Sequence, residues 1–216
     1  MYRGRLTGAL AVFMVCSSLA WAGVATAGSG GVGTGESPPP SSEPSADSSY
    51  QKIAFGKRDL RRGHRGNDVK TLTWLLRAQS LYVPTGPDFI GQTEKAVRRF
   101  QSSIGVSTTG VVRKSTRKGF ARRMRINRAT WYGPGFWGNR TACGQRLKKT
   151  TIGVAHKKLP CGTKVTFAHR GRWVRARVID RGPYNGNYRW DLTRRLAKRL
   201  GFLRVGAGSL RAAVVR

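Results

Sequence analysis

The spacing of apolar side chains changes near the middle of this chain of 216 residues. In the first half they recur every three or four positions, as at Val69, Leu72, Leu75 and Leu76, which predicts a helix with one buried face. After about residue 128 they gather in short runs separated by glycine, which is typical of strands and turns. We therefore expect a helical part followed by a mainly-β part.

Further helices are expected in the first part. A break at Pro84 ends the first helical pattern, and a second helix begins near Thr93 with Ala96 and Phe100 on one face. A third, short helix is expected over Ser115–Met124. The pattern thus predicts a small all-α, three-helix domain over residues 53–124.

The second part predicts a small barrel over residues 128–216. One helix is expected over Thr193–Leu200, with Gly201 as its C-terminal stop. The expected strands are Ala129–Tyr132, Thr151–Ala155, Lys164–Phe167, Trp173–Ile179 and Ser209–Val215. Many short strands with a single helix are typical of such barrels.

The N-terminal residues have the features of a secretory signal. Arg3 and Arg5 precede an apolar stretch that is too short to span a membrane comfortably, and Ala25-Thr26-Ala27 supplies small residues for cleavage before Gly28. Residues 1–27 are therefore predicted to be a signal peptide, with a buried N-terminal helix as the alternative. We expect a secreted or wall-associated protein with no stable membrane anchor after cleavage.

A flexible linker and a strong positive charge complete this picture. Residues 28–52 are rich in Gly, Ser and Pro and poor in large apolar side chains, so they are predicted to form a tether. The formal net charge is +32 at pH 7, which favours polyanionic partners. Because export separates the protein from nucleic acid, we expect anionic cell-wall polymers instead.

Cleavage of the signal would leave Cys143 and Cys161. In an exported protein these residues are expected to form a disulfide. A zinc site that also uses His156 is one alternative, and a reactive thiol is another. No metal or cofactor motif is visible, so none is expected.

The helical part resembles a known binding module. The runs Arg65-Gly66-Asn67-Asp68-Val69, Asp88-Phe89-Ile90-Gly91-Gln92-Thr93 and Phe100-Gln101 are similar to those of the three-helix peptidoglycan-binding domain. The resemblance implies binding of peptidoglycan without catalysis. Side chains near Arg65, Asp88 and Phe89 are possible contacts.

Carboxylates are scarce in the second part. From Arg125 to the last residue, Asp180 and Asp191 are the only acidic side chains. A basic domain that retains two acids is expected to use at least one of them. The alternatives are that Asp180 pairs with an arginine and that Asp191 caps the helix that follows it.

Several motifs of this part resemble the double-psi beta-barrel of the rare lipoprotein A family, and expansins share that barrel. The similar runs are Ala129-Thr130-Trp131-Tyr132-Gly133, Thr141-Ala142-Cys143-Gly144, Val154-Ala155-His156, Leu159-Pro160-Cys161-Gly162-Thr163, Asp180-Arg181-Gly182-Pro183 and Asp191-Leu192-Thr193. The resemblance implies a lytic transglycosylase that acts on peptidoglycan glycan strands, with Asp180 and His156 in the active site and Asp191 beside them. Such an enzyme uses no water, since one group protonates the leaving oxygen and then takes a proton from the sugar's 6-hydroxyl. A single acid can therefore suffice, whereas hydrolases normally use two.

Other side chains near these motifs are assigned to substrate binding. Aromatic faces suit sugar rings. We place the rings of Tyr132, Trp137 and Tyr184 in the groove, and those of Trp131 and Trp190 in the core. The substrate-binding set is Tyr132, Trp137, Thr141, Gln145, Arg181 and Tyr184.

One departure from the family leaves a second function open. Gln145 stands where the family has Glu, and an amide cannot donate a proton as an acid. If arginines crowd Asp180, His156 would have to supply the acid. The alternatives are a non-catalytic, expansin-like binder or wall loosener and a secreted polyanion binder unrelated to glycan.

Overall fold

The computed structural model describes residues 52–215. The predicted signal peptide and residues 28–51 of the predicted linker lie outside the described residues. The helical part and the barrel belong to one compact unit. The predicted division into a domain at 53–124 and another at 128–216 stays a prediction.

Three helices occupy the first part, at α1 (Asn67–Ala78), α2 (Gly91–Ser103) and α3 (Lys114–Arg123). Asp68 in the first turn of α1 and Arg77 in its last turn both complement the helix dipole. The apolar faces of the helices meet in a core where the Phe100 and Phe120 rings stack with centroids 3.9 Å apart. The helix pattern read from the sequence therefore corresponds to the faces that are buried.

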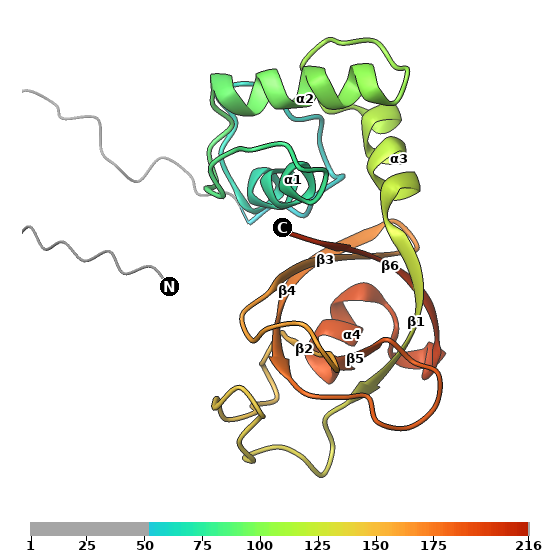
Figure 1. Ribbon diagram of the computed structural model, residues 1–216. Helices are drawn as coiled ribbons and strands as arrows, with labels where there is room; N and C mark the ends of the chain where they lie inside the picture. The colour runs from blue at the N-terminus through green and yellow to red at the C-terminus, as the bar shows by residue number, and fades with distance from the viewer. Residues whose placement is uncertain (1–51, 216) are drawn as a thin grey trace, which may run out of the picture. The chain divides into compact units, whose positions relative to one another are not determined.

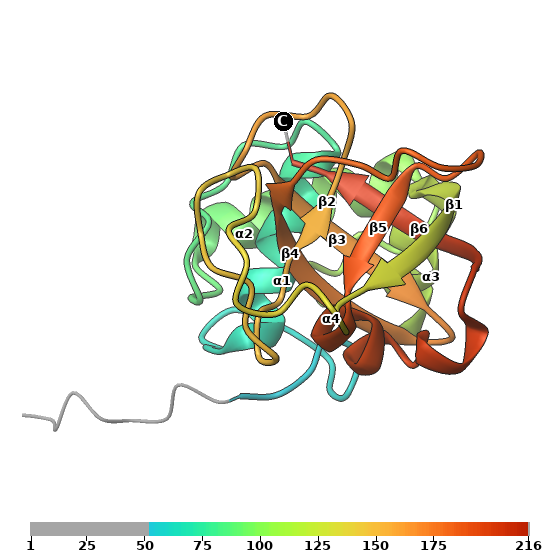
Figure 2. The same ribbon diagram turned by 90° about the horizontal axis from the view of Figure 1, so that it is seen from below.

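The second part is a closed barrel, so the prediction of a mainly-β barrel is confirmed (Figure 1). Its strands are β1 (Arg125–Tyr132), β2 (Val154–Ala155), β3 (Lys164–His169), β4 (Arg172–Asp180), β5 (Trp190–Thr193) and β6 (Gly208–Val214). They follow one another around the barrel in the order β1-β5-β2-β4-β3-β6 (Figure 2). The order brings β5 and β4, which are consecutive in sequence, to either side of β2.

The barrel has its own core, with the helix α4 (Arg194–Leu200) packed against β4 and β5. The Thr193 side chain accepts a hydrogen bond from Leu196 N, so Thr193 is the N-cap of α4 and Asp191 is not. Gly201 adopts a left-handed conformation with φ 66° and ends the helix, as expected. A short 3₁₀ turn, η1 (Leu203–Val205), leads to β6.

Candidate active site

A groove of about 430 Å³ lies at the end of the barrel where β1, β5, β2 and β4 meet the loops. Asp180 and Asp191 both line it. The other lining residues are Thr130, Tyr132, Phe136, Asn139, Arg140, Thr141, Leu147, Ala155, Arg181, Gly182, Pro183, Tyr184, Asn185 and Tyr188. The structure thus brings together acids that are eleven positions apart in the sequence.

A row of register partners forms the floor of this groove. Thr130 on β1 pairs with Asp191 on β5, Asp191 pairs with Ala155 on β2, and Ala155 pairs with Asp180 on β4. Register partners project to the same face of a sheet, with neighbouring strands about 4.8 Å apart. The two carboxylates therefore flank the small side chain of Ala155.

The surroundings of Asp191 shift its carboxyl toward the neutral form. Burial raises its pKa above the ordinary value, and the nearby charge of Asp180 raises it further. The Thr130 hydroxyl donates a hydrogen bond of 2.5 Å to Asp191 Oδ1, which acts in the opposite direction. A carboxyl with a raised pKa can serve as a proton donor.

Asp180 is held as an acceptor by backbone groups. Ala142 N and Arg181 N each donate a hydrogen bond of 2.9 Å to its Oδ1. The Arg181 side chain turns elsewhere, since its NH1 donates to Leu159 O at 3.1 Å. Among the described residues, no arginine side chain forms an ion pair with the Asp180 carboxylate, so that alternative is wrong.

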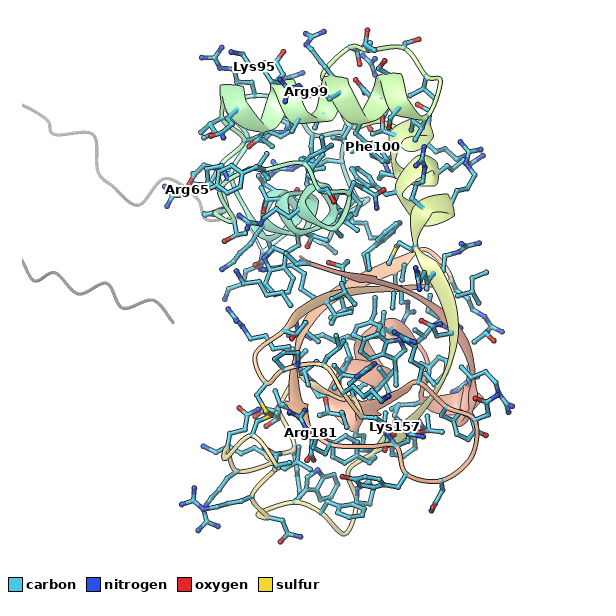
Figure 3. The ribbon with its side chains drawn as sticks, in the orientation of Figure 1. Arg65, Lys95, Arg99, Phe100, Lys157 and Arg181 are labelled. Atoms are coloured by element: carbon cyan, nitrogen blue, oxygen red, sulfur yellow. A yellow bond between two sulfur atoms is a disulfide. The ribbon has the colours of Figure 1, made fainter. Side chains whose placement is uncertain are left out.

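The loop that provides Ala142 is fixed to the barrel by a disulfide. Cys143 and Cys161 are bonded, so the predicted disulfide is confirmed, and the zinc site and the reactive thiol are not formed by these residues. Arg181 lies beside this bond, with its NH2 group 3.5 Å from Cys161 Sγ (Figure 3). The disulfide therefore stabilises the wall of the groove next to Asp180.

Tyr132 carries a buried hydroxyl at the groove. Burial raises its pKa above the ordinary value, and the charges of Asp180 and Asp191 raise it further, so the phenol stays protonated. Among the described residues this hydroxyl makes no hydrogen bond of ordinary geometry, and neither does the buried hydroxyl of Thr141. Hydrogen bonding to the Asp180 carboxylate also contributes to the raised pKa of Tyr132, so this hydroxyl is shared between that acid and a bound sugar, whereas the Thr141 hydroxyl has no partner among the described residues.

His156 lies beside the groove and does not line it. The side chain is buried, and its Nδ1 accepts hydrogen bonds from Lys158 N at 3.0 Å and Leu159 N at 2.9 Å. Burial, together with the charges of Arg189 and Arg181, lowers its pKa to about 4. The ring is therefore neutral at pH 7 and fixes the turn that leads to Cys161.

The aromatic residues divide differently from the prediction. Tyr184 lines the groove and is 77% exposed, but Trp137 is not in the lining and lies under the Lys149 ammonium, 5.1 Å from it. Trp190 is buried in the core, and Trp131 packs against that core. The prediction for Trp137 rests on its position between two motifs, and such a position does not determine where the side chain points.

The structure adds residues to the groove and leaves Gln145, like Trp137, outside its lining. Gln145 is exposed and absent from the lining, while its carbonyl accepts a hydrogen bond from Thr141 N at 2.8 Å. The sequence interpretation missed Thr130, Phe136 and Tyr188. Of these three, only Thr130 could have been found from the sequence, because it lies in the run that contains Tyr132.

Two observations limit other kinds of site. Among the described residues, no group of three or more His, Cys, Asp or Glu side chains is placed to hold a metal ion. No helix within residues 52–215 has the length and apolar character needed to cross a membrane.

In the helical part, Phe89 is buried in the core and cannot contact a ligand, whereas Asp88 and Arg65 are exposed and ion-paired at 3.3 Å.

Comparison with known proteins places the barrel among peptidoglycan-active relatives. Residues 126–212 match a protein-family model described as "Lytic transglycolase". The chain is 39% identical over 97 residues to the probable endolytic peptidoglycan transglycosylase RlpA of Synechocystis, covering 44% of this chain and 30% of that protein. It is 38% identical over 89 residues to the RlpA of Campylobacter jejuni, covering 40% of this chain and 32% of that protein.

Among solved structures, a Clavibacter michiganensis expansin is 25% identical, with a TM-score of 0.36, over 42% of this chain and 50% of that one. The chain spans about a third of the length of the two curated relatives. The resemblance to the rare lipoprotein A family is confirmed over the barrel.

Proposed function

We propose that this protein is a secreted cell-wall protein that binds peptidoglycan and cleaves its glycan strands as a lytic transglycosylase. The observation that carries the proposal is the open groove in which Asp191 and Asp180 flank Ala155. The matched family model and the similarity to endolytic peptidoglycan transglycosylases support the same reaction class. Its volume of about 430 Å³ is within the range of pockets that hold small ligands.

Asp191 is the proton donor in this proposal. Its protonated carboxyl gives a proton to the glycosidic oxygen, and the bond from C1 to that oxygen breaks. The resulting carboxylate then takes the proton of the sugar's 6-hydroxyl as that oxygen bonds to C1, which closes the anhydro ring. No water is consumed, and Asp191 returns to its starting state.

Asp180 stabilises the positive charge that develops at the sugar ring as the bond breaks. Its carboxylate is fixed by the Ala142 and Arg181 backbone N–H groups, so it need not reorganise during the reaction. Tyr132 and Thr141 donate to substrate hydroxyls from the same wall. The exposed ring of Tyr184 stacks on a sugar at the rim.

His156 acts through positioning in this account. A neutral ring with both backbone donors at Nδ1 is a poor proton donor at pH 7. Its place between β2 and Cys161 instead sets the turn beside the groove. Gln145 binds substrate only if glycan extends beyond the lining, because its side chain lies outside it.

The helical part is proposed to hold the protein on peptidoglycan. Linking a binding module to the barrel raises the local concentration of glycan at the groove. Exposed residues such as Arg65 and Asp88 are its contacts, since Phe89 is covered. The predicted signal peptide and linker would deliver the protein to the wall and give it reach.

The second candidate is a non-catalytic, expansin-like wall binder. It is compatible with the two backbone donors on Asp180, which suit that group to accept hydrogen bonds whether or not the glycosidic bond is cut. The absence of the family Glu argues less strongly for it, because Gln145 is outside the groove lining.

Product analysis separates the two candidates. Purified protein is incubated with sacculi, and the soluble fraction is examined by mass spectrometry for anhydro-muropeptides, with Asp180→Asn and Asp191→Asn beside the wild type. Release by the wild type alone supports the transglycosylase. Binding to sacculi with no release by any of the three proteins supports the expansin-like binder.

A further inference from the structure

A second cleft, which shares no lining residue with the groove, is lined by positive charge. It has a volume of about 970 Å³ and lies where α1 and the segment at 52–57 approach β4. Eight of its lining residues are Lys or Arg, and none is Asp or Glu. They are Lys52, Lys57, Lys70, Arg170, Arg172, Arg175, Arg177 and Arg199.

The cations concentrate around one indole. Lys164, Arg175 and Arg177 lie 5.7, 5.2 and 5.9 Å from the centre of the Trp74 ring. Arg175 is fixed there by hydrogen bonds to Thr71 and Asn67 of α1. Burial lowers the pKa of Lys164, and the charges of Arg177, Arg77 and Lys70 lower it further, so the cluster repels itself.

The described carboxylates lie elsewhere. Within residues 52–215 they are Asp59, Asp68, Asp88, Glu94, Asp180 and Asp191. The first four form ion pairs with arginines of the helical part, and the last two line the groove of the barrel. A cluster of like charges in this position is stabilised by an anion from outside the described part of the chain.

Trp74 gives a second indication of a ligand. It lines the cleft while being only 4% exposed, and its indole N–H has no acceptor among the described residues. An N–H of this kind is satisfied by an anionic oxygen. Guanidinium groups in the same cleft match the paired oxygens of a phosphate.

We propose that this cleft binds a strand of a phosphodiester polymer of the cell wall, with Lys70, Arg177 and Arg199 contacting its phosphates. A cleft with eight cations is too large for one phosphate and suits a chain with repeated charges. Nucleic acid has the same phosphates, but its bases stack on exposed aromatic faces. Of the aromatic residues in the cleft, Trp74 and Phe55 are both 4% exposed, and the partly buried Trp173 packs edge-on against Phe55. The assignment of this polymer to the cell wall rests on the proposed function, whereas the inference that the cleft binds an anion does not.

The test measures binding of a synthetic poly(glycerol phosphate) of about ten units to the full chain, over a range of salt concentrations. Lys70→Gln/Arg177→Gln removes two cleft charges. Lys95→Gln/Arg99→Gln removes one Lys and one Arg from the exposed surface of α2 and serves as the matched control (Figure 3). Melting curves of both variants are used to check that each is folded.

The cleft variant is expected to bind the polymer about tenfold more weakly than the wild type. The magnitude of its slope of log affinity against log salt concentration should decrease by roughly 1.5, while the control variant should match the wild type in both quantities. Equal losses in the two variants would mean that net charge alone drives binding and would overturn the site. Equal affinity for single-stranded DNA or polyglutamate of the same charge would overturn the assignment to a wall phosphodiester.

A second assay keeps this inference separate from the proposed function. On glycan that carries no phosphate polymer, the cleft variant should release products at the wild-type rate, because its residues lie outside the groove. If the wild type releases nothing while polymer binding still depends on Lys70 and Arg177, the proposed transglycosylase fails and the cleft stands. A cleft variant that loses both activities would contradict the inference.

Discussion

Asp180 and Asp191 are both register partners of Ala155, one from each strand that flanks β2. Their side chains therefore project to one face about two strand spacings apart, with only a methyl group between them. This arrangement gives the groove two acids with different surroundings. Asp191 is partly buried and hydrogen-bonded to Thr130, whereas Asp180 is hydrogen-bonded to backbone N–H groups.

The pH dependence should report on Asp191. Because the reaction needs its protonated form, the rate should fall as pH rises through its raised pKa. Thr130→Val removes the hydrogen bond that favours the carboxylate, so the alkaline limb should move to higher pH. Rates measured from pH 4 to 8 on both proteins check this. An unchanged limb in Thr130→Val would argue against Asp191 as the donor.

His156 should affect stability more than chemistry. Its pKa is about 4 in the folded protein against 6.5 when unfolded, so the unfolded state binds more protons between those values. This contribution to stability should therefore be fully present above pH 6.5 and be lost as pH falls through about 4. Denaturant melts across this range, compared with His156→Asn, isolate the effect.

The same position offers a test of mechanism. An Asn oxygen can replace Nδ1 as the acceptor for Lys158 N and Leu159 N, whereas His156→Ala leaves both donors unsatisfied. We expect His156→Asn to retain most of the product release and His156→Ala to lose stability by about 1–3 kcal/mol. Abolished release in a well-folded His156→Asn would show that the ring takes part in proton transfer.

The disulfide should support both stability and activity. Cys143 and Cys161 are separated by 18 positions, and removing such a crosslink costs about 3 kcal/mol in the chain-entropy model. Cys143 also follows Ala142, whose N–H holds Asp180. The Cys143→Ser/Cys161→Ser variant should unfold at lower denaturant and release product more slowly. Reductant should have the same effect on the wild type and none on the variant.

Gly153 should tolerate no side chain. A Cβ there would overlap the Ile179 side chain, which is buried and adjacent to Asp180. Gly153→Ala should lower the free energy of unfolding by about 1–3 kcal/mol. Gly91→Ala, where a Cβ meets only Arg62 at 3.8 Å, is the matched control and should be neutral or slightly stabilising. Partial rescue by adding Ile179→Val would confirm the contact.

The sequence predicted those parts of the fold that have a clear period or a motif. The helices of the first part and α4 follow from spacing, and the acids stood out because the second part has no others. The strand β5 was missed because four residues, Trp190–Thr193, are too short to show an alternation. It is this strand that brings Asp191 beside β2, so the geometry of the two acids was not visible in the sequence.

Side-chain direction was the other limit. Gln145 and His156 lie in recognisable motifs and Trp137 lies between two of them, but none of the three side chains is in the groove lining. Conversely, Phe136 and Tyr188 line it from loops with no pattern of their own. Loops of this kind are positioned by tertiary contacts, here including the disulfide, and not by local periodicity.

The most direct test of the central claim is to digest sacculi in water enriched in ¹⁸O and to analyse the released sugars by mass spectrometry. If Asp191 and Asp180 cleave by internal attack of the 6-hydroxyl, the wild type should release anhydro ends without ¹⁸O, and Asp191→Asn should release far less. New reducing ends in place of anhydro ends would show hydrolysis and contradict the account, as would release by Asp191→Asn at the wild-type rate.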